Sequence, residues 1–266
     1  MMINSLLLVI GENSINLFKE FNIETIIPKI FINNKKSENV FNLPTNLIYI
    51  IESEKITTDY DDKFLDIMED YLYYDHYFIL SDIYDNFSYS SIKVFGKHFR
   101  DKITGIFIVP FSFENISKGK KIENYIFELN NIYKKFFIFK DDYLLKAFTN
   151  VPMKMLPKLK ALLIQNLITN ISESLDLEEL KFLEKGELGF GISINERMDK
   201  LPDSLMEALE SPWISKSHQN FFIIFNGNLN NEDILPALKI MENKNYRFKI
   251  NKSNKGRTIY ITVISY

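Results

Sequence analysis

Glycine-rich turns that follow buried strands are the segments in which this sequence would carry phosphate chemistry. Such a turn needs glycines because the backbone must approach the phosphates closely and present its N–H groups to them. The segment VIGENSIN follows a predicted buried strand, but it contains only Gly11, and Glu12 adds a carboxylate beside it. The segment GELGFG at 186–191 lacks the lysine and the helix that complete a phosphate loop. We therefore interpret GELGFG as a strand with close backbone packing.

The other residue types that support catalysis or metal binding are sparse or scattered. The chain has no cysteine, which excludes disulfides and thiolate metal sites, and its three histidines (His76, His98 and His218) are far apart in the sequence. Asp141 and Asp142 are adjacent, so we expect their side chains to diverge. The sequence therefore predicts no catalytic residues, no metal and no cofactor.

Length, composition and charge favour a soluble cytoplasmic protein. The 266 residues suffice for one large domain or two modest ones, and 46% apolar and 25% charged residues are typical of globular proteins. The net charge of -3 gives no electrostatic reason to expect nucleic acid as a partner. No stretch reaches the ~20 apolar residues of a membrane span, and the first residues lack the basic region of a signal peptide. We expect no direct contact with nucleic acid or membrane.

Strands and helices alternate through the first half of the sequence. The predicted buried strands are SLLLVI, KIFINN, LIYIIES, YFILSDI, GIFIVPF and KFFIFK. Helices are expected after Gly11 and at 61–74, 88–101 and 117–134. This alternation predicts an α/β fold with a mainly parallel sheet and helices on both of its faces.

A long helical pattern at 153–173 separates this half from a second half with a different order of strands and helices. The later segments predict a glycine-containing strand, a helix ended by Pro212, a strand, a helix, and a hairpin of YRFKIN with RTIYITVISY. We predict a Rossmann-like domain over 1–152, a central helix over 153–173 and a smaller α+β domain over 174–266. Trp213, the only tryptophan, is either exposed at a domain edge, where it would mark an interface, or a buried cap.

The order of these segments resembles the FtsZ/tubulin family. GIFIVPFSFENISKGKK is similar to the family's V-G-V-V-x-x-P-F-x-F-E-G, with Pro110, Phe111, Phe113 and Glu114 in register. FFIFKDDYLLKAF resembles I-V-I-P-N-D-R-L-L, LGFGIS resembles L-M-G-I-G, ALESPW resembles A-I-S-S-P-L, and RTIYITVISY resembles V-R-V-T-V-I-A-T-G. The resemblance implies an FtsZ/tubulin-like fold. It also implies that Phe111 and Phe113 lie in the core beneath the neighbouring helix, as the usual burial of phenylalanine suggests.

The glycine loops of that family are missing from this sequence. The signature loop G-G-G-T-G-[TS]-G should follow YFILS, where the chain reads DIYDNFSYSSIKVF without a glycine. A triphosphate at this place would meet carboxylates and bulk instead of bare backbone. We predict a degenerate pocket that does not bind GTP in the usual mode, near Gly11, Glu12, Tyr84, Asp85 and Asp142.

The family's acidic loop N-x-D-x-x-D, which activates water on the nucleotide of the next subunit, is similar to ISESLDLEELKF. Asp176 and Glu179 stand at the acidic positions, and we propose them as partner-binding residues. The competing interpretation, which the shortened loop favours, is a helix start with Ser174 as N-cap and Glu178 or Glu179 in the first turn.

Three functions are open at this point. We favour a non-catalytic FtsZ-like pseudo-GTPase that contacts a protein partner, such as a genuine FtsZ-type subunit of a cytoskeletal or cell-division system, or that assembles without nucleotide. The second is a small-molecule-binding protein or enzyme that uses the emptied pocket around Tyr84, Asp85, Tyr89 and Asp142. The third, altered nucleotide binding, is disfavoured by the missing glycines. The sequence stops at its last predicted strand, so we expect recruitment to a membrane to require a partner. The oligomeric state is left open.

Overall fold

The structure of the protein is a computed structural model that describes residues 3–21, 27–34, 48–51, 61–114, 119–252 and 258–266. Its strands are β1 (Ser5–Ile10), β2 (Lys29–Asn33), β3 (Ile48–Ile50), β4 (His76–Asp82), β5 (Ile103–Val109), β6 (Lys135–Lys140), β7 (Gly186–Asn195), β8 (Asn220–Asn226), β9 (Asn245–Asn251) and β10 (Ile259–Ser265). Its helices are α1 (Glu12–Phe18), α3 (Asp61–Glu69), α4 (Asn86–Phe99), α5 (Gly119–Ile132), α6 (Asp142–Ala147), α7 (Leu156–Ser174), α8 (Leu177–Phe182), α9 (Leu201–Leu209) and α10 (Asn231–Leu238).

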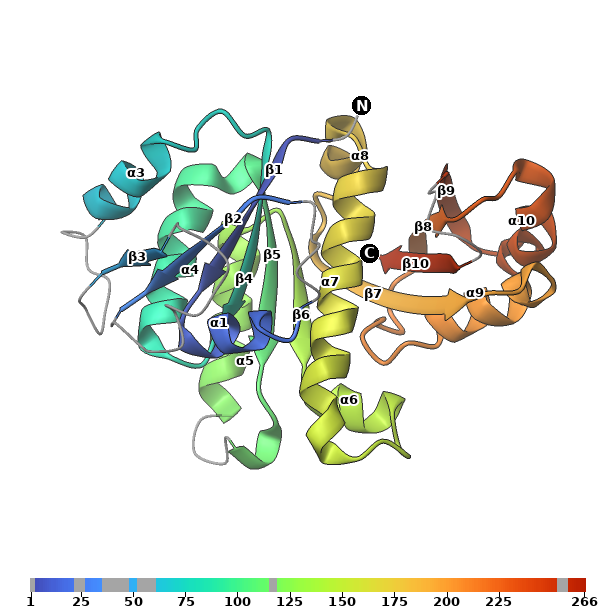
Figure 1. Ribbon diagram of the computed structural model, residues 1–266, viewed down its shortest axis with the longest axis horizontal. Helices are drawn as coiled ribbons and strands as arrows, with labels where there is room; N and C mark the ends of the chain where they lie inside the picture. The colour runs from blue at the N-terminus through green and yellow to red at the C-terminus, as the bar shows by residue number, and fades with distance from the viewer. Residues whose placement is uncertain (1–2, 22–26, 35–47, 52–60, 115–118, 253–257) are drawn as a thin grey trace.

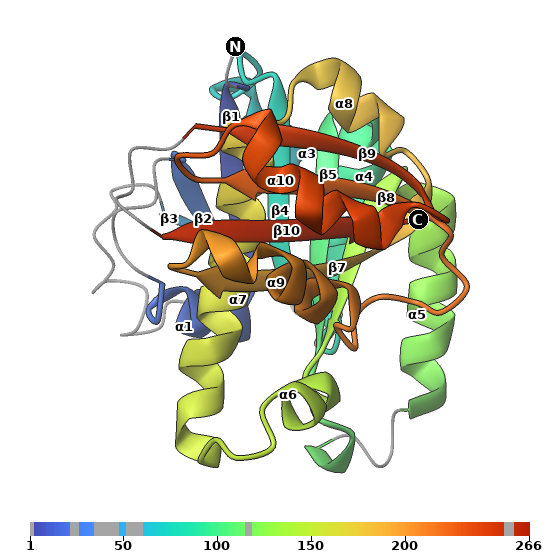
Figure 2. The same cartoon turned by 90° about the vertical axis from the view of Figure 1, so that its right-hand side faces the viewer.

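These strands form one ten-stranded sheet in the order β3-β2-β1-β4-β5-β6-β7-β10-β8-β9 (Figures 1 and 2). Neighbouring strands are parallel except where β10 pairs with β7 and with β8. The predicted α/β fold with a mainly parallel sheet is confirmed. The segments SLLLVI and GIFIVPF lie in the same sheet, as the family resemblance requires.

Helices cover both faces of the first half of the sheet, so its strands are buried on both sides. Along β1, Leu7 and Val9 join the core beneath α1 and α7, whereas Leu6, Leu8 and Ile10 join the core beneath α3, α4 and α5. This arrangement explains why the strands are continuous apolar runs rather than alternating ones.

Helix α7 lies between the two halves of the molecule and contacts both (Figure 1). The described helix begins three residues after the predicted start, because a 3-10 turn occupies Met153–Met155. Buried hydrogen bonds join α7 to strands β8 and β10 of the sheet. Asn226 Nδ2 donates to Asn170 Oδ1 (2.7 Å), and Asn170 Nδ2 donates to Thr262 Oγ1 (2.7 Å). This contact orients the C-terminal half against the central helix.

The C-terminal hairpin prediction is wrong. Strand β10 lies between β7 and β8, and β9 pairs in parallel with β8 at the edge of the sheet. Helix α10 lies between β8 and β9 in the chain, which makes this segment a crossover unit. Burial agrees with these positions, because β10 is almost wholly buried whereas β9 is exposed at several residues.

The predicted burial of the two phenylalanines after β5 is also wrong for Phe113. Phe111 is half-buried against the core beneath α7, but Phe113 is 55% exposed. The two rings stack on each other with centroids 5.0 Å apart. Pro110 ends the strand and a 3-10 turn at Ser112–Glu114 follows, so the chain leaves the sheet before Phe113 reaches the core.

Candidate functional site

The strand order of the sheet marks one edge as the place for a ligand. In an open parallel sheet, ligands bind beyond the carboxyl ends of the strands where the strand order reverses. In the order β3-β2-β1-β4-β5-β6 the reversal falls between β1 and β4. The two segments that the sequence marked as altered phosphate loops follow these two strands. Gly11 comes directly after β1, and Asp85 comes three residues after the end of β4.

Gly11 keeps the backbone conformation of a tight turn, but the space in front of it is filled. Its φ is 86°, in the left-handed region that favours glycine. A Cβ atom placed on Gly11 would lie 2.0 Å from Ser88 Oγ, in the first turn of α4. The glycine is therefore needed for close approach to a side chain of the protein itself.

The N-terminus of α4 already holds an anion, the carboxylate of Asp85. Asp85 is the N-cap, and its Oδ1 accepts a hydrogen bond from the backbone N–H of Ser88 (2.8 Å). A helix N-terminus attracts negative charge through its free N–H groups and its dipole. A phosphate at this position would have to displace the Asp85 side chain.

A second carboxylate, Asp82, is buried at the same edge. It is 3% exposed, and Asn13 Nδ2 of α1 donates to its Oδ2 (2.6 Å). The backbone N–H of Tyr84 donates to its other oxygen. Burial raises the pKa of Asp82, against the effect of these hydrogen bonds, and the nearby Asp85 carboxylate raises it further. Together with Glu12 in the first turn of α1, these groups make the edge unfavourable for phosphate.

Asp141 and Asp142 diverge as predicted. Asp141 is 4% exposed and forms an ion pair with Lys160 of α7, with Nζ 2.7 Å from Oδ2. Desolvation raises the pKa of Asp141 to about 6, although Lys160 opposes the shift. Asp142 Oδ1 accepts instead from the backbone N–H of Ser112 (3.0 Å). The sequence offered no signal for the pair with Lys160, since the two residues lie on separate elements.

A cavity of about 300 Å³ opens between α1, α6 and the start of α7 at this edge. Its wall combines apolar side chains with the Asp141–Lys160 pair and with polar groups of α1. The lining residues are Asn13, Asn16, Leu17, Glu20, Phe111, Asp141, Leu144, Met153, Leu156, Pro157 and Lys160.

The residues that the sequence proposed for a pocket, Tyr84, Asp85 and Asp142 among them, do not line this cavity. Tyr89 is a residue of α4 whose side chain contacts α5. Its hydroxyl donates to Glu128 Oε2 (2.7 Å), and its ring stacks on Tyr125.

Comparison with solved structures identifies this architecture. An empty FtsZ dimer from M. jannaschii has a TM-score of 0.79 and 15% identity, covering 97% of this chain and 87% of that one. CetZ2 from Haloferax volcanii, a GTPγS-bound protofilament, has a TM-score of 0.77 and 9% identity, covering 98% of this chain and 92% of that one. The chain has the fold of FtsZ and CetZ, proteins of the tubulin superfamily. Its sequence matches no protein-family model, and no curated protein is significantly similar to it.

In this FtsZ-type fold, Asp176 and Glu179 form a helix cap at the start of α8. Asp176 Oδ1 accepts from the Glu179 N–H (2.9 Å), and Glu179 Oε2 accepts from the Asp176 N–H (2.8 Å). Lys249 of β9 also pairs with Glu179 at 2.6 Å. The predicted helix start is correct in kind but wrong in its cap residue: Ser174 ends α7, and its hydroxyl donates to Asn226 Oδ1 (3.1 Å). Partner binding by Asp176 and Glu179 stays a prediction.

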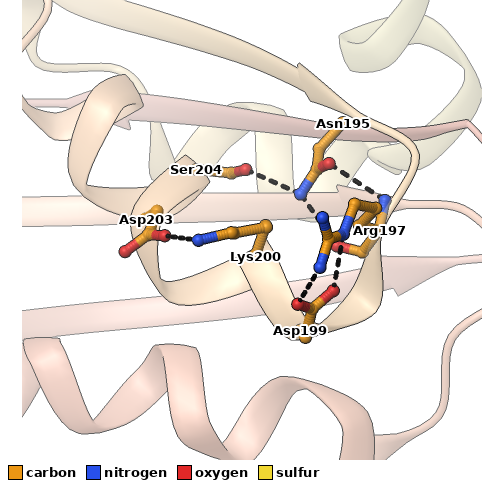
Figure 3. A network of polar contacts seen from close by, with 6 residues as sticks. All are labelled: Asn195, Arg197, Asp199, Lys200, Asp203 and Ser204. Carbon is orange, nitrogen blue, oxygen red and sulfur yellow. Dashed lines mark hydrogen bonds and ion pairs between the residues drawn. The ribbon is translucent and has the colours of Figure 1, made fainter.

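A second polar network orders the connection between β7 and α9 (Figure 3). The side chain of Asn195 accepts from the Arg197 N–H (2.9 Å) and donates to Ser204 Oγ (3.0 Å). Arg197 makes two hydrogen bonds to Asp199. These groups satisfy one another, so the network shapes the loop and does not form a ligand site.

Two further findings concern metals and membranes. Within the described ranges, no group of three or more His, Cys, Asp or Glu residues is arranged to hold a metal ion. No helix in the described part of the chain is long and apolar enough to cross a membrane.

Proposed function

We propose that this chain is a non-catalytic FtsZ-like protein that acts through contact with another protein, as a partner or regulator of a cytoskeletal GTPase. The observation that carries the proposal is the occupied N-terminus of α4. Asp85 supplies the anion there, and Ser88 fills the space against Gly11. The position that the fold offers to the phosphates of a nucleotide, between Gly11 and the start of α4, is therefore filled by the chain's own side chains, and we call it the closed edge.

The relatives suggest the kind of contact. The similar solved structures include an FtsZ dimer and a CetZ2 protofilament bound to GTPγS. We propose that a subunit with a closed nucleotide edge retains only one of the two faces that stack in a filament. Asp176 and Glu179 would then dock on a genuine GTP-loaded subunit, and the chain would terminate the filament. A cytoplasmic location and a role in cell division belong to the same proposal.

A direct test of the closed edge is nucleotide binding. We expect isothermal titration of the protein with GTP and magnesium to show no binding at micromolar concentrations and no hydrolysis. The reason is electrostatic, because the carboxylates of Asp82 and Asp85 lie where phosphates would need donors. Tight magnesium-dependent binding would overturn the non-catalytic assignment.

The partner contact is tested by assembly. The protein is mixed at substoichiometric ratio with an FtsZ- or CetZ-type GTPase from the same organism, and polymer mass is followed by light scattering. We expect reduced polymer mass. The variant Asp176→Asn/Glu179→Gln, which keeps acceptors for the cap, should lose this effect.

The matched control removes the same number of carboxylates from the first turn of α10, which also begins with a capping box. Glu232→Gln/Asp233→Asn removes two carboxylates there and should act like the unaltered protein. If the unaltered protein leaves polymer mass unchanged, the capping proposal is wrong.

A second candidate function is favoured by the cavity of about 300 Å³ between α1, α6 and the start of α7. Its wall contains the Asp141–Lys160 pair, which offers both a donor and an acceptor to a small polar ligand. In this case the protein would be a small-molecule binder. This second function would be supported over the first if the unaltered protein captures a metabolite from native extract and leaves polymer mass unchanged. A Lys160→Met variant should then lose the metabolite.

A further inference from the structure

The two halves of the sheet separate beside Trp213. Strands β6 and β7 pair only through Lys135–Phe137 and Gly186–Leu188, and β7 then pairs with β10. Trp213 is 9% exposed, with ring centroids 4.7 Å from Phe139 and 5.4 Å from Phe190. The sequence left open whether Trp213 is exposed at a domain edge or is a buried cap, and its burial agrees with the second interpretation. Trp213 packs where the first half of the sheet meets the second.

A cavity of about 740 Å³ opens next to this tryptophan, large enough for a small organic ligand. Both halves of the molecule line it. The first half contributes Lys140 at the end of β6 and Lys146 of α6. The second half contributes Lys216 in the connection from α9 to β8, and Lys244 just before β9.

Positive charge dominates this wall although the whole chain has a net charge of -3. The lining contains the four lysines and two carboxylates, Glu187 and Glu210. Burial lowers the pKa of His218, which also lines the cavity, so this side chain is neutral at pH 7. The remaining lining residues have aliphatic, aromatic or hydroxyl side chains, among them Ile138, Tyr143, Leu188 and Ser215.

The four lysines are available to an anion. Among the residues that the structure describes, none of them forms an ion pair with a carboxylate, in contrast to Lys160 and Lys249. Desolvation raises the pKa of Glu187 and the nearby Lys140 opposes this rise, but the two side chains do not form an ion pair. Three rest on aromatic rings instead: Lys140 and Lys146 lie 5.7 and 4.7 Å from the ring centroid of Tyr143, and Lys244 lies 4.9 Å from that of Phe221. Such contacts on open surfaces are weak, so a ligand can displace them.

The tryptophan beside the cavity has a hydrogen-bond donor without an acceptor in the part of the chain that the structure describes. The indole Nε1 of Trp213 is buried and has no acceptor among the described residues. A buried donor without an acceptor costs free energy.

We propose that this cavity binds a small organic polyanion, a molecule with two or more carboxylate or phosphate groups. Four lysines that form no ion pair among the described residues supply the charge, and the aromatic walls around Tyr143 and Trp213 supply the apolar contact. The bound anion bridges lysines of both halves and therefore holds them in one relative arrangement. This site is independent of the closed nucleotide edge and of the proposed function.

The only tryptophan of the chain is a built-in reporter for this site. The probes are citrate for carboxylates and tripolyphosphate for phosphates, each titrated while the fluorescence of Trp213 is recorded. Sodium chloride at equal ionic strength is the control for screening. We expect a saturable change with at least one probe and none with sodium chloride, and the better probe identifies the anionic group.

Variants locate the binding. Lys140→Gln/Lys244→Gln should weaken binding by roughly 100-fold, because it removes two charge-assisted contacts. The control Lys158→Gln/Lys239→Gln changes two exposed lysines outside the cavity and should bind like the unaltered protein. If the first variant unfolds, Lys216→Gln on the exposed connection should still weaken binding about tenfold.

The proposal is wrong if neither probe gives a saturable signal by fluorescence and by calorimetry. It is also wrong if the control variant weakens binding as much as the cavity variant, since that result would assign the effect to net charge alone.

Discussion

The edge beyond β1 and β4 and the cavity beside Trp213 carry opposite charge. At the edge, Asp82 and Asp85 lie close to Gly11, and one of them caps the helix that follows. In the cavity, four lysines outnumber two carboxylates, and none of the four forms an ion pair among the described residues. The strand order of the fold favours a ligand site at the edge. The lysines of this chain favour one in the cavity.

This difference shows that the place where a fold favours anions by its geometry need not be the place where the charged side chains attract them. A parallel sheet with helix N-termini at its carboxyl edge favours anions there by its geometry alone. In this chain two aspartates and one serine occupy the position of the phosphates, while the strands keep the order of the fold. The junction of the two halves has no such geometric preference, so its attraction for anions depends on side chains from segments far apart in the sequence.

The largest expected effect concerns the cavity side. Trp213→Ala should lower the free energy of unfolding by about 3–5 kcal/mol, because a large buried ring between Phe139 and Phe190 is lost. Urea denaturation followed by far-ultraviolet circular dichroism measures the change. Trp213→Phe, which keeps a ring in the gap, should cost much less. A loss below about 1 kcal/mol for the alanine variant would show that Trp213 does not hold the junction.

The next effect tests the filled space at the edge. Gly11→Ala should cost about 2–4 kcal/mol, from the left-handed backbone and from contact with Ser88 Oγ. Ser88→Ala alone should be nearly neutral, because its buried hydroxyl has no partner among the described residues. The double variant should recover part of the loss. Strict additivity of the two changes in urea denaturation would contradict the contact.

The third prediction concerns Asp141, which lies at the edge and not in the cavity beside Trp213. We expect its carboxyl to make the stability of the protein depend on pH. Burial raises the pKa of this carboxyl from 3.8 to about 6, so the folded state binds a proton that the unfolded state releases between these values. Stability relative to Asp141→Asn should therefore fall as the pH rises from about 4 to about 6, by the order of 2 kcal/mol.

The comparison with Asp141→Asn is needed because His76 acts in the opposite direction. Burial lowers the pKa of His76 well below 6.5, so its contribution is present above pH 6.5 and is lost as the pH falls. His76 is present in both the unaltered protein and the Asp141→Asn variant, so its effect cancels when their free energies of unfolding are subtracted. A difference that does not vary with pH would mean that Asp141 titrates normally.

The smallest effect concerns the cap of α4. Asp85→Ala should cost about 1 kcal/mol through the lost hydrogen bond to the Ser88 N–H, whereas Asp85→Asn should cost less than half of that. Thermal unfolding resolves the two. If Asp85→Asn gains tight GTP binding, the aspartate alone excluded the nucleotide, and the missing glycines matter less than we infer.

Much of the fold was predictable because it depends on neighbouring residues. Runs such as SLLLVI and GIFIVPF predict buried strands, and their alternation with helices predicts a mainly parallel sheet. The missing glycines after β1 and β4 and the divergence of Asp141 from Asp142 were predictable for the same reason. Each of these features follows from the types and spacing of residues within one short segment.

The rest was decided by the order of strands in space. The insertion of β10 between β7 and β8, the exposure of Phe113 and the pairing of Asp141 with Lys160 all depend on which segments become neighbours. The cavity brings Lys140 together with Lys244, more than 100 residues further along the chain. Local periodicity determines which face of an element is buried, but only the packed sheet determines which distant charges share a cavity.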